Sequence, residues 1–322
     1  MLAVPILLIT FNRPDYVSQV LSAIKKVQPQ DLYIFQDGPR NGSDYDSDHC
    51  AKVRSLLGGL IDWNCNVHTF FSKDNLGCGP GPAAAISWFF DNVEQGIILE
   101  DDAVPNVDFF HYASELLERY RSDSSVCAIG SMNVDTHSWG DGSYYFSMMN
   151  RNLCAWATWK RAWSHFDIHM RGVSRCKLNQ ALRKYHCGVL EREYWCDRLD
   201  EVHKDCCGGK SWDMQFFMSI WMQHGKGIIP NVNLSSNIGT VGGATHRMSA
   251  GNIIDNVPTS PILPLKHPSI TNIQYEADWR FHYLYFEPYR KDWKWYQIAY
   301  YFVNKRIKKF VGHQGPWLRR KR

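Results

Sequence analysis

Five short apolar runs, rich in β-branched and aromatic residues, are spaced along the first half of the chain, and this spacing constrains the fold most. The runs are residues 4–10 (VPILLIT), 31–37 (DLYIFQD), 66–72 (NVHTFFS), 96–100 (GIILE) and 126–130 (VCAIG). Each reads as a strand, and helix-like segments separate them. Strands that alternate with helices form βαβ units. The sequence therefore predicts an α/β fold with a mostly parallel sheet flanked by helices.

Polar side chains follow three of these runs at their carboxyl ends. Thr10 and Arg13 follow the first run, Asp37 ends the second, and the acidic triplet of residues 100–102 ends the fourth. Ligands of open α/β sheets bind at the carboxyl ends of the strands. We therefore expect these side chains to form a binding site.

The acidic triplet consists of Glu100, Asp101 and Asp102. Like charges this close repel one another unless a positive charge or a hydrogen-bond donor holds them. One acid could cap a helix starting near residues 106–108, but capping explains one acid and not three. Strand alternation would send Glu100 and Asp102 to one side and Asp101 to the other. We therefore favour a site for a divalent cation that also contacts a second ligand.

The second half of the chain, from about residue 140, is aromatic and rich in Cys and Gly, with an apolar helical patch at 213–225. Asp213 stands beside Trp212 at the start of this patch. It is either a first-turn acid favoured by the helix dipole or a carboxylate that accepts a proton from a sugar hydroxyl stacked on the indole. His246 follows a glycine pair, as a ligand for metal or phosphate or as a surface histidine.

Two glycine-rich segments lack the features of phosphate-binding loops. In GCGPGP (residues 77–82), two prolines remove amide donors that a dinucleotide-binding loop needs. In GGKSW (residues 208–212), a P-loop would require glycine at position 204, where Lys204 stands. The ten cysteines have no regular spacing and no C-x-x-C pair, which favours free thiols and a cytoplasmic location.

The C-terminal segment of residues 290–322, called the basic tail below, holds eleven Lys and Arg side chains and one acid. Its aromatic and aliphatic residues recur at spacings of three and four, which predicts an amphipathic helix. This helix would dock on the anionic inner face of a membrane or pack on the protein itself. The rest of the chain has 25 basic and 31 acidic side chains, which argues against a nucleic-acid-binding protein.

Four segments in a fixed order carry a resemblance to a known family: PILLITFNRP, FQDG, ILEDD and, much later, WD at residues 212–213. Together they resemble nucleotide-diphospho-sugar glycosyltransferases of the GT-A fold, which is Rossmann-like. The similarity is closest to the inverting N-acetylglucosaminyltransferase I family and covers about residues 4–246. The chain departs from the family after the third strand, where NLGCGPGP replaces a basic or histidine residue.

The resemblance implies roles for single residues. Asp102 would bind a divalent cation, Mn²⁺ or Mg²⁺, and Asp101 the ribose of the donor. Glu100 and Trp212 would contact the donor sugar, and Asp213 would be the catalytic base.

The resemblance extends to three residues near the first two strands and to one near residue 245. Thr10, Arg13 and Asp37 would bind the nucleotide sugar. His246 would be a second metal ligand, since a histidine in this region often ligates the metal in GT-A enzymes.

The organisation implied is a nucleotide-sugar-binding half (1–135), an acceptor-side half of the same domain (136–275) and a basic aromatic C-terminal region (276–322). The implied reaction is inverting sugar transfer to a glycan or a lipid-linked glycan, in bacterial surface polysaccharide synthesis. A sugar nucleotidyltransferase is the main alternative, although such enzymes carry a Gly-rich loop after the first strand, where this chain has TFNRPDY. A nucleic-acid-binding protein that uses the basic tail is a further alternative, but we expect no nucleic acid partner.

Overall fold

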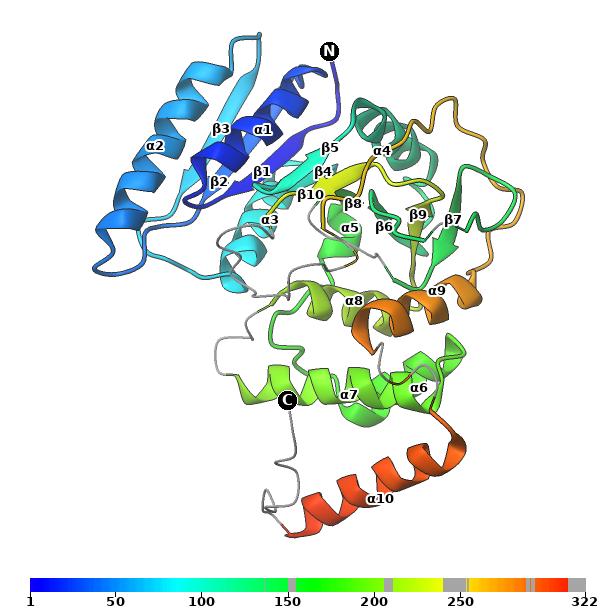
Figure 1. The fold of residues 1–322 in the computed structure, drawn as a ribbon. Coiled ribbons are helices and arrows are strands. Elements are labelled where there is room, and N and C mark those ends of the chain that lie inside the picture. Colours follow the sequence, from blue (N-terminus) through cyan, green and yellow to red (C-terminus); the bar gives the residue numbers. More distant parts are fainter. Residues whose placement is uncertain are drawn as a thin grey trace.

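The computed structural model describes residues 1–135, 137–149, 155–205, 211–239, 253, 255–287, 290 and 293–311 (Figure 1). The strands in these residues are β1 (Ile6–Thr10), β2 (Asp31–Gln36), β3 (Asn66–Phe71), β4 (Gln95–Glu100), β5 (Ala103–Pro105), β6 (Val126–Gly130), β7 (Tyr144–Ser147), β8 (Ala155–Trp159), β9 (Lys226–Pro230) and β10 (Ser235–Asn237). The helices are α1 (Pro14–Lys25), α2 (Asp44–Leu60), α3 (Pro80–Asn92), α4 (Val107–Arg119), α5 (Lys160–Trp163), α6 (Arg175–Lys184), α7 (Val189–Lys204), α8 (Asp213–Met222), α9 (Tyr275–Phe281), the π-helix η1 (His282–Phe286) and α10 (Trp295–Val311).

An eight-stranded sheet with the order β3-β2-β1-β4-β8-β6-β9-β7 forms the centre of the fold. The five predicted strands are confirmed as β1, β2, β3, β4 and β6. The first four are parallel neighbours, as expected. The sequence did not indicate that β8 pairs antiparallel with both β4 and β6 and so separates them. The sheet therefore takes strands from both predicted halves of the domain.

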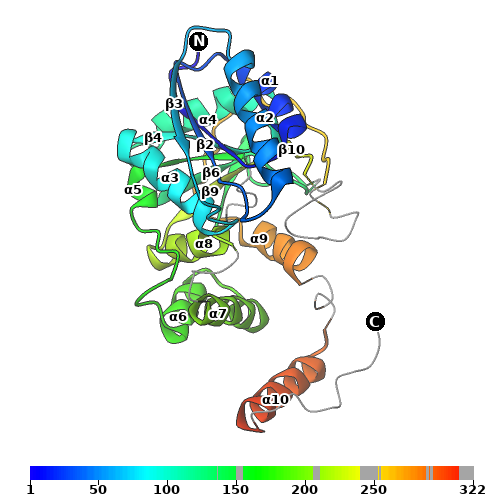
Figure 2. The ribbon, with the colours of Figure 1, turned by 90° about the vertical axis from the view of Figure 1, so that its left-hand side faces the viewer.

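Helices cover both faces of the sheet, because its inner strands bury side chains on both sides. On β1, Ile6 and Leu8 belong to the hydrophobic cluster that includes α1, α2 and α4, whereas Leu7 and Ile9 belong to the cluster that includes α3, α5 and α8. This is the period-two pattern of a central strand. Helices α1 and α2 lie on the opposite side of the sheet from α3 in Figure 2.

The second half adds helices at one end of the sheet. Helices α6 and α7 pack on each other and on α8, and α10 lies beyond α7, farthest from the sheet (Figures 1 and 2). The predicted helices at 213–225 and in the basic tail correspond to α8 and α10. In the part of the chain that the structure describes, no helix has the length and apolar character needed to cross a membrane.

Candidate functional site

The parallel strands β1, β2 and β4 end at the same edge of the sheet, and the predicted site residues of the first half collect there. Glu100 is the last residue of β4, and a turn at residues 101–102 leads into β5. Arg13 directly precedes α1, and Asp37 directly follows β2. The structure thus brings these three strand ends together as predicted.

Arg13, which lies between β1 and α1, forms ion pairs with two acids of the triplet. One guanidinium nitrogen, Nη2, contacts Asp101, and the other, Nη1, lies 3.0 Å from Asp102 Oδ2. Asp101 is 3% exposed, and its second oxygen accepts a hydrogen bond of 3.3 Å from the amide of Phe11. The counter-charge that the triplet requires is therefore, in this structure, an arginine of the same chain.

One sequence-based expectation about the triplet is wrong, and one alternative considered for it is excluded. Asp101 and Asp102 do not face opposite sides, since one guanidinium contacts both. The strand ends at Glu100, and the alternation of side chains does not continue into the turn. Nor does an acid of the triplet cap the next helix: Asn106 is the N-cap of α4 and accepts a 3.0 Å hydrogen bond from the amide of Phe109. The capping explanation of the triplet is thereby excluded.

The charges in the cluster shift one another's protonation. Burial, together with the charges of Asp102, Asp101 and Asp213, raises the pKa of Glu100 to about 8. Burial also raises the pKa of Asp101 to about 6, although Arg13 opposes this shift. Burial lowers the pKa of the Arg13 guanidinium, but the charges of Asp101 and Asp102 outweigh it and raise that pKa above its ordinary value. The site thus gathers acidic groups whose ionised forms repel one another, and an added cation would relieve this repulsion.

Asp213 lies close enough to the triplet for its charge to raise the pKa of Glu100. It is the first residue of α8, and its Oδ1 accepts hydrogen bonds from the hydroxyl of Ser211 and, at 2.9 Å, from the amide of Met214. Asp213 is therefore an acid of the first turn of α8, as one of the two interpretations of the sequence predicted. This does not exclude the catalytic interpretation, which stays a prediction.

Trp212 is 4% exposed and is part of the core between the sheet and the helices. Its ring stacks on Trp156 with a centroid distance of 5.7 Å and meets Trp163 edge-on at 6.0 Å. These contacts position the start of α8 and hence Asp213. The predicted contact between Trp212 and a donor sugar stays a prediction.

The segment after β10 runs directly past Asp102, because β10 pairs antiparallel with β5. The amide of Ile238 donates a 2.9 Å hydrogen bond to the Asp102 carbonyl. A Cβ atom on Gly239 would lie 2.0 Å from Asp102 Oδ2, so only glycine fits there without a shift. His246, the second predicted metal ligand, lies outside the described residues.

The fit of a metal ion to this site can be judged from Asp102 itself. Its Oδ1 is buried and has no hydrogen-bond partner among the described residues. A buried carboxylate oxygen without a donor is costly, and a hard cation is a suitable partner for it. No group of three or more His, Cys, Asp or Glu side chains in the described ranges is placed to hold a metal ion. Asp102 would therefore need further ligands from elsewhere, such as a diphosphate.

Thr10 and Asp37 hold the strand ends together. The hydroxyl of Thr10, which is 2% exposed, donates a 2.9 Å hydrogen bond to the carbonyl of Phe35. The carboxylate of Asp37 accepts hydrogen bonds from the amides of Gly38, Leu76 and Gly77 and from the side chain of Asn75. Burial raises the pKa of Asp37, although these amides oppose the shift. The predicted contacts of Thr10 and Asp37 with a nucleotide sugar stay predictions.

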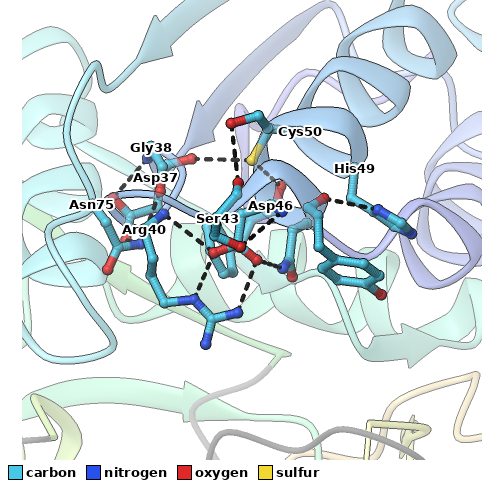
Figure 3. A network of polar contacts seen from close by, with 12 residues as sticks. Asp37, Gly38, Arg40, Ser43, Asp46, His49, Cys50 and Asn75 are labelled. Atoms are coloured by element: carbon cyan, nitrogen blue, oxygen red, sulfur yellow. Dashed lines mark hydrogen bonds and ion pairs between the residues drawn. The ribbon is translucent and has the colours of Figure 1, made fainter.

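A buried carboxylate that the sequence did not single out completes this edge (Figure 3). Asp46 in α2 is fully buried and pairs with Arg40, whose Nε lies 2.6 Å from its Oδ2, and with Asn12, whose amide lies 2.7 Å from its Oδ1. The hydrogen bond from Arg40, together with weaker effects, lowers the pKa of Asp46 to about 2. Asp46 stands three residues after Ser43, the N-cap of α2, so the sequence offered only the pattern of a helix start.

No family model matches the sequence, and no curated protein matches it. Parts of several solved structures are similar to part of this chain. HddC from Yersinia pseudotuberculosis aligns with 49% of this chain and 78% of its own, at 11% identity and a TM-score of 0.30. UDP-glucose pyrophosphorylase complexed with UDP-glucose aligns with 51% and 79%, at 8% identity and a TM-score of 0.30.

A putative glucose-1-phosphate thymidylyltransferase from Bacillus anthracis, in complex with a sucrose, aligns with 53% of this chain and 76% of its own, at 12% identity and a TM-score of 0.33. The names of the last two structures denote sugar nucleotidyltransferases. A likeness of this extent is partial and says nothing about the reaction of this chain.

Proposed function

We propose that the chain is an enzyme that binds a nucleotide sugar at the carboxyl end of β4 and transfers the sugar to an acceptor hydroxyl. The observation that carries this proposal is the meeting of two acidic groups from distant parts of the sequence. Glu100, Asp101 and Asp102 come from the sheet, and Asp213 begins α8, near enough to affect the pKa of Glu100. The triplet would bind the donor nucleotide sugar, and Asp213 would act on the acceptor hydroxyl.

On the donor side, the aspartates provide two functions. Asp102, through its unpaired Oδ1, would hold a divalent cation, Mn²⁺ or Mg²⁺, and Asp101 would bind the ribose. Such a cation supplies positive charge that stabilises a departing nucleoside diphosphate. Arg13 binds Asp102 through the other oxygen, Oδ2, so arginine and cation would not compete for the same atom.

On the acceptor side, Asp213 would accept the proton of the acceptor hydroxyl, which is a poor nucleophile at neutral pH. The acceptor oxygen then forms a bond to the anomeric carbon while the bond from that carbon to the diphosphate breaks. Attack from the face opposite the leaving group inverts the anomeric centre. The acceptor in this proposal is a glycan or a lipid-linked glycan.

A sugar nucleotidyltransferase is the second candidate, and the names of the similar solved structures fit it better than they fit glycosyl transfer. The two reactions differ in their need for a base. A sugar phosphate is already ionised when it attacks a nucleotide, whereas a sugar hydroxyl must lose a proton. The carboxylate of Asp213 beside the triplet therefore favours glycosyl transfer.

The products distinguish the two reactions. The purified chain is incubated with Mn²⁺ or Mg²⁺ and a panel of UDP-, GDP- and dTDP-sugars, and release of nucleoside diphosphate is measured. In parallel, pyrophosphate release is measured from nucleoside triphosphates and sugar 1-phosphates. Glycosyl transfer predicts the first product and its loss in Asp102→Asn, with Asp48→Asn on the exposed side of α2 as the control. Pyrophosphate release alone would establish the nucleotidyltransferase instead.

A further inference from the structure

Helix α10 (Trp295–Val311) has two faces with different surroundings. It lies beyond α7 at the end of the molecule farthest from the sheet, in both views of the fold (Figures 1 and 2). Its inner face contacts α7, and several side chains of its outer face are exposed to solvent. The sequence left packing on the body and docking on a membrane as alternatives, but a helix with two such faces can do both.

Ion pairs hold the inner face of α10 against α7. Lys305 Nζ lies 2.5 Å from Glu193 Oε1 and 2.6 Å from both carboxylate oxygens of Asp197, on α7. The ring of Tyr301, one turn earlier on the same face, lies 4.4 Å from the guanidinium carbon of Arg290. Arg290 in turn pairs with Glu287, which is fully buried. These contacts fix which side of α10 faces outward.

The outer face exposes large aromatic and aliphatic side chains. Trp295 is 79% exposed, Tyr296 56%, Tyr300 71% and Val303 55%. Tyr296, Tyr300 and Val303 follow one another at spacings of four and three, so they share one face of the helix. Large apolar side chains that are exposed together on one helix face are typical of an interaction site. Trp and Tyr are the residues that favour the boundary between a bilayer and water.

The charge of the surrounding sequence indicates which kind of partner the outer face of α10 binds. The basic tail, in which α10 lies, has eleven Lys and Arg side chains and one acid, whereas the rest of the chain is acidic. An aromatic helix face within a strongly cationic segment is complementary to an anionic lipid surface. We propose that Trp295, Tyr296, Tyr300 and Val303 insert into the interface of an anionic bilayer, with α10 in the membrane plane and its inner face still bound to α7.

Vesicle flotation of the full chain tests this assignment without reference to any enzymatic activity. The triple variant Trp295→Ser/Tyr296→Ser/Tyr300→Ser is compared with wild type and with Tyr45→Ser, which changes a tyrosine of α2 that is 61% exposed. Wild type and Tyr45→Ser should float with vesicles of phosphatidylcholine and phosphatidylglycerol but not with phosphatidylcholine alone. The triple variant should lose about tenfold in partitioning while its thermal unfolding stays unchanged.

Three results would overturn the proposal. The first is flotation of the triple variant equal to that of wild type, and the second is no preference of wild type for the anionic vesicles. The third is a wild-type dimer in sedimentation that becomes monomeric in the triple variant, because the outer face would then bind a second copy. Lys305→Met, which alters only the inner face, should float like wild type, and its failure to do so would contradict the orientation of α10.

Discussion

Arg13 Nη1 lies 3.0 Å from Asp102 Oδ2, so an arginine that follows β1 neutralises an acid that follows β4. The other oxygen of the same carboxylate, Oδ1, is buried without a hydrogen-bond partner among the described residues. One oxygen of Asp102 thus pairs with Arg13, and the other is available for the divalent cation that we propose. This division reconciles the arginine that the structure shows with the metal that we propose.

Removing the positive charge of Arg13 should destabilise the protein. Arg13→Met leaves Asp101 and Asp102 without their partner, and we expect the free energy of unfolding to fall by about 3 kcal/mol, the lower end for a buried charge left unpaired. Urea denaturation in the presence of EDTA measures this loss. Lys25→Met breaks an exposed pair with Asp62 and should cost less than about 1 kcal/mol. Equal losses in the two variants would contradict the role of Arg13.

The raised pKa of Glu100 predicts how stability depends on pH. Its ordinary value is 4.5 and its value in the folded protein is about 8. Between these values the folded state keeps a proton that the unfolded chain has lost, so stability falls as the pH rises through this range. Asp101, with its pKa raised to about 6, acts in the same direction.

Glu100→Gln should therefore reduce the loss of stability between pH 5 and pH 8, because glutamine does not ionise. The measurement is the unfolding free energy at several pH values without divalent cations. Glu118→Gln, an exposed substitution on α4, should keep the wild-type pH dependence. If Glu100→Gln also kept it, the raised pKa of Glu100 would be disproved.

Asp213→Asn should slow turnover while leaving donor binding intact. Asparagine keeps the shape and the hydrogen bond to the amide of Met214 but does not accept a proton, so the expected loss is roughly 10² to 10⁴-fold in turnover. Asp200→Asn, an acid of α7 paired with Arg175, is the matched control and should turn over like wild type. Near-normal turnover in Asp213→Asn would remove this residue from the mechanism.

The five predicted strands are those whose own residues show the pattern of a strand. Strand β1 and the other four predicted strands are β-branched or aromatic runs that helix-length segments separate from one another. Strand β8 lacks this context, since its partners β4 and β6 both precede it and both pair with it antiparallel. Pairings between segments far apart in the sequence leave no trace in periodicity. The central position of β8 was therefore not predictable.

The sequence predicted most residues of the candidate site, but it did not predict how all of them are oriented. The strand ends brought Arg13, Asp37 and the acidic triplet to one edge, as the α/β pattern predicts. The predicted run already ended at Glu100, but strand alternation was extended into the turn at residues 101–102, and so the directions of Asp101 and Asp102 were wrong. Asp46 was missed because its burial depends on Arg40 and Asn12, which only the fold brings together.

The central claim is that Asp102 holds a divalent cation that binds a nucleotide sugar. Thermal unfolding with a panel of nucleotide sugars, with Mn²⁺ and with EDTA, tests it most directly, since a ligand at about 100 times its Kd adds roughly 2.7 kcal/mol of stability. Wild type and Asn106→Ala, which loses the α4 cap and a hydrogen bond to the carbonyl of Ser260, should both be stabilised in a Mn²⁺-dependent way, and Asp102→Asn should not. Unchanged Mn²⁺-dependent stabilisation of Asp102→Asn by the same nucleotide sugar would contradict the claim.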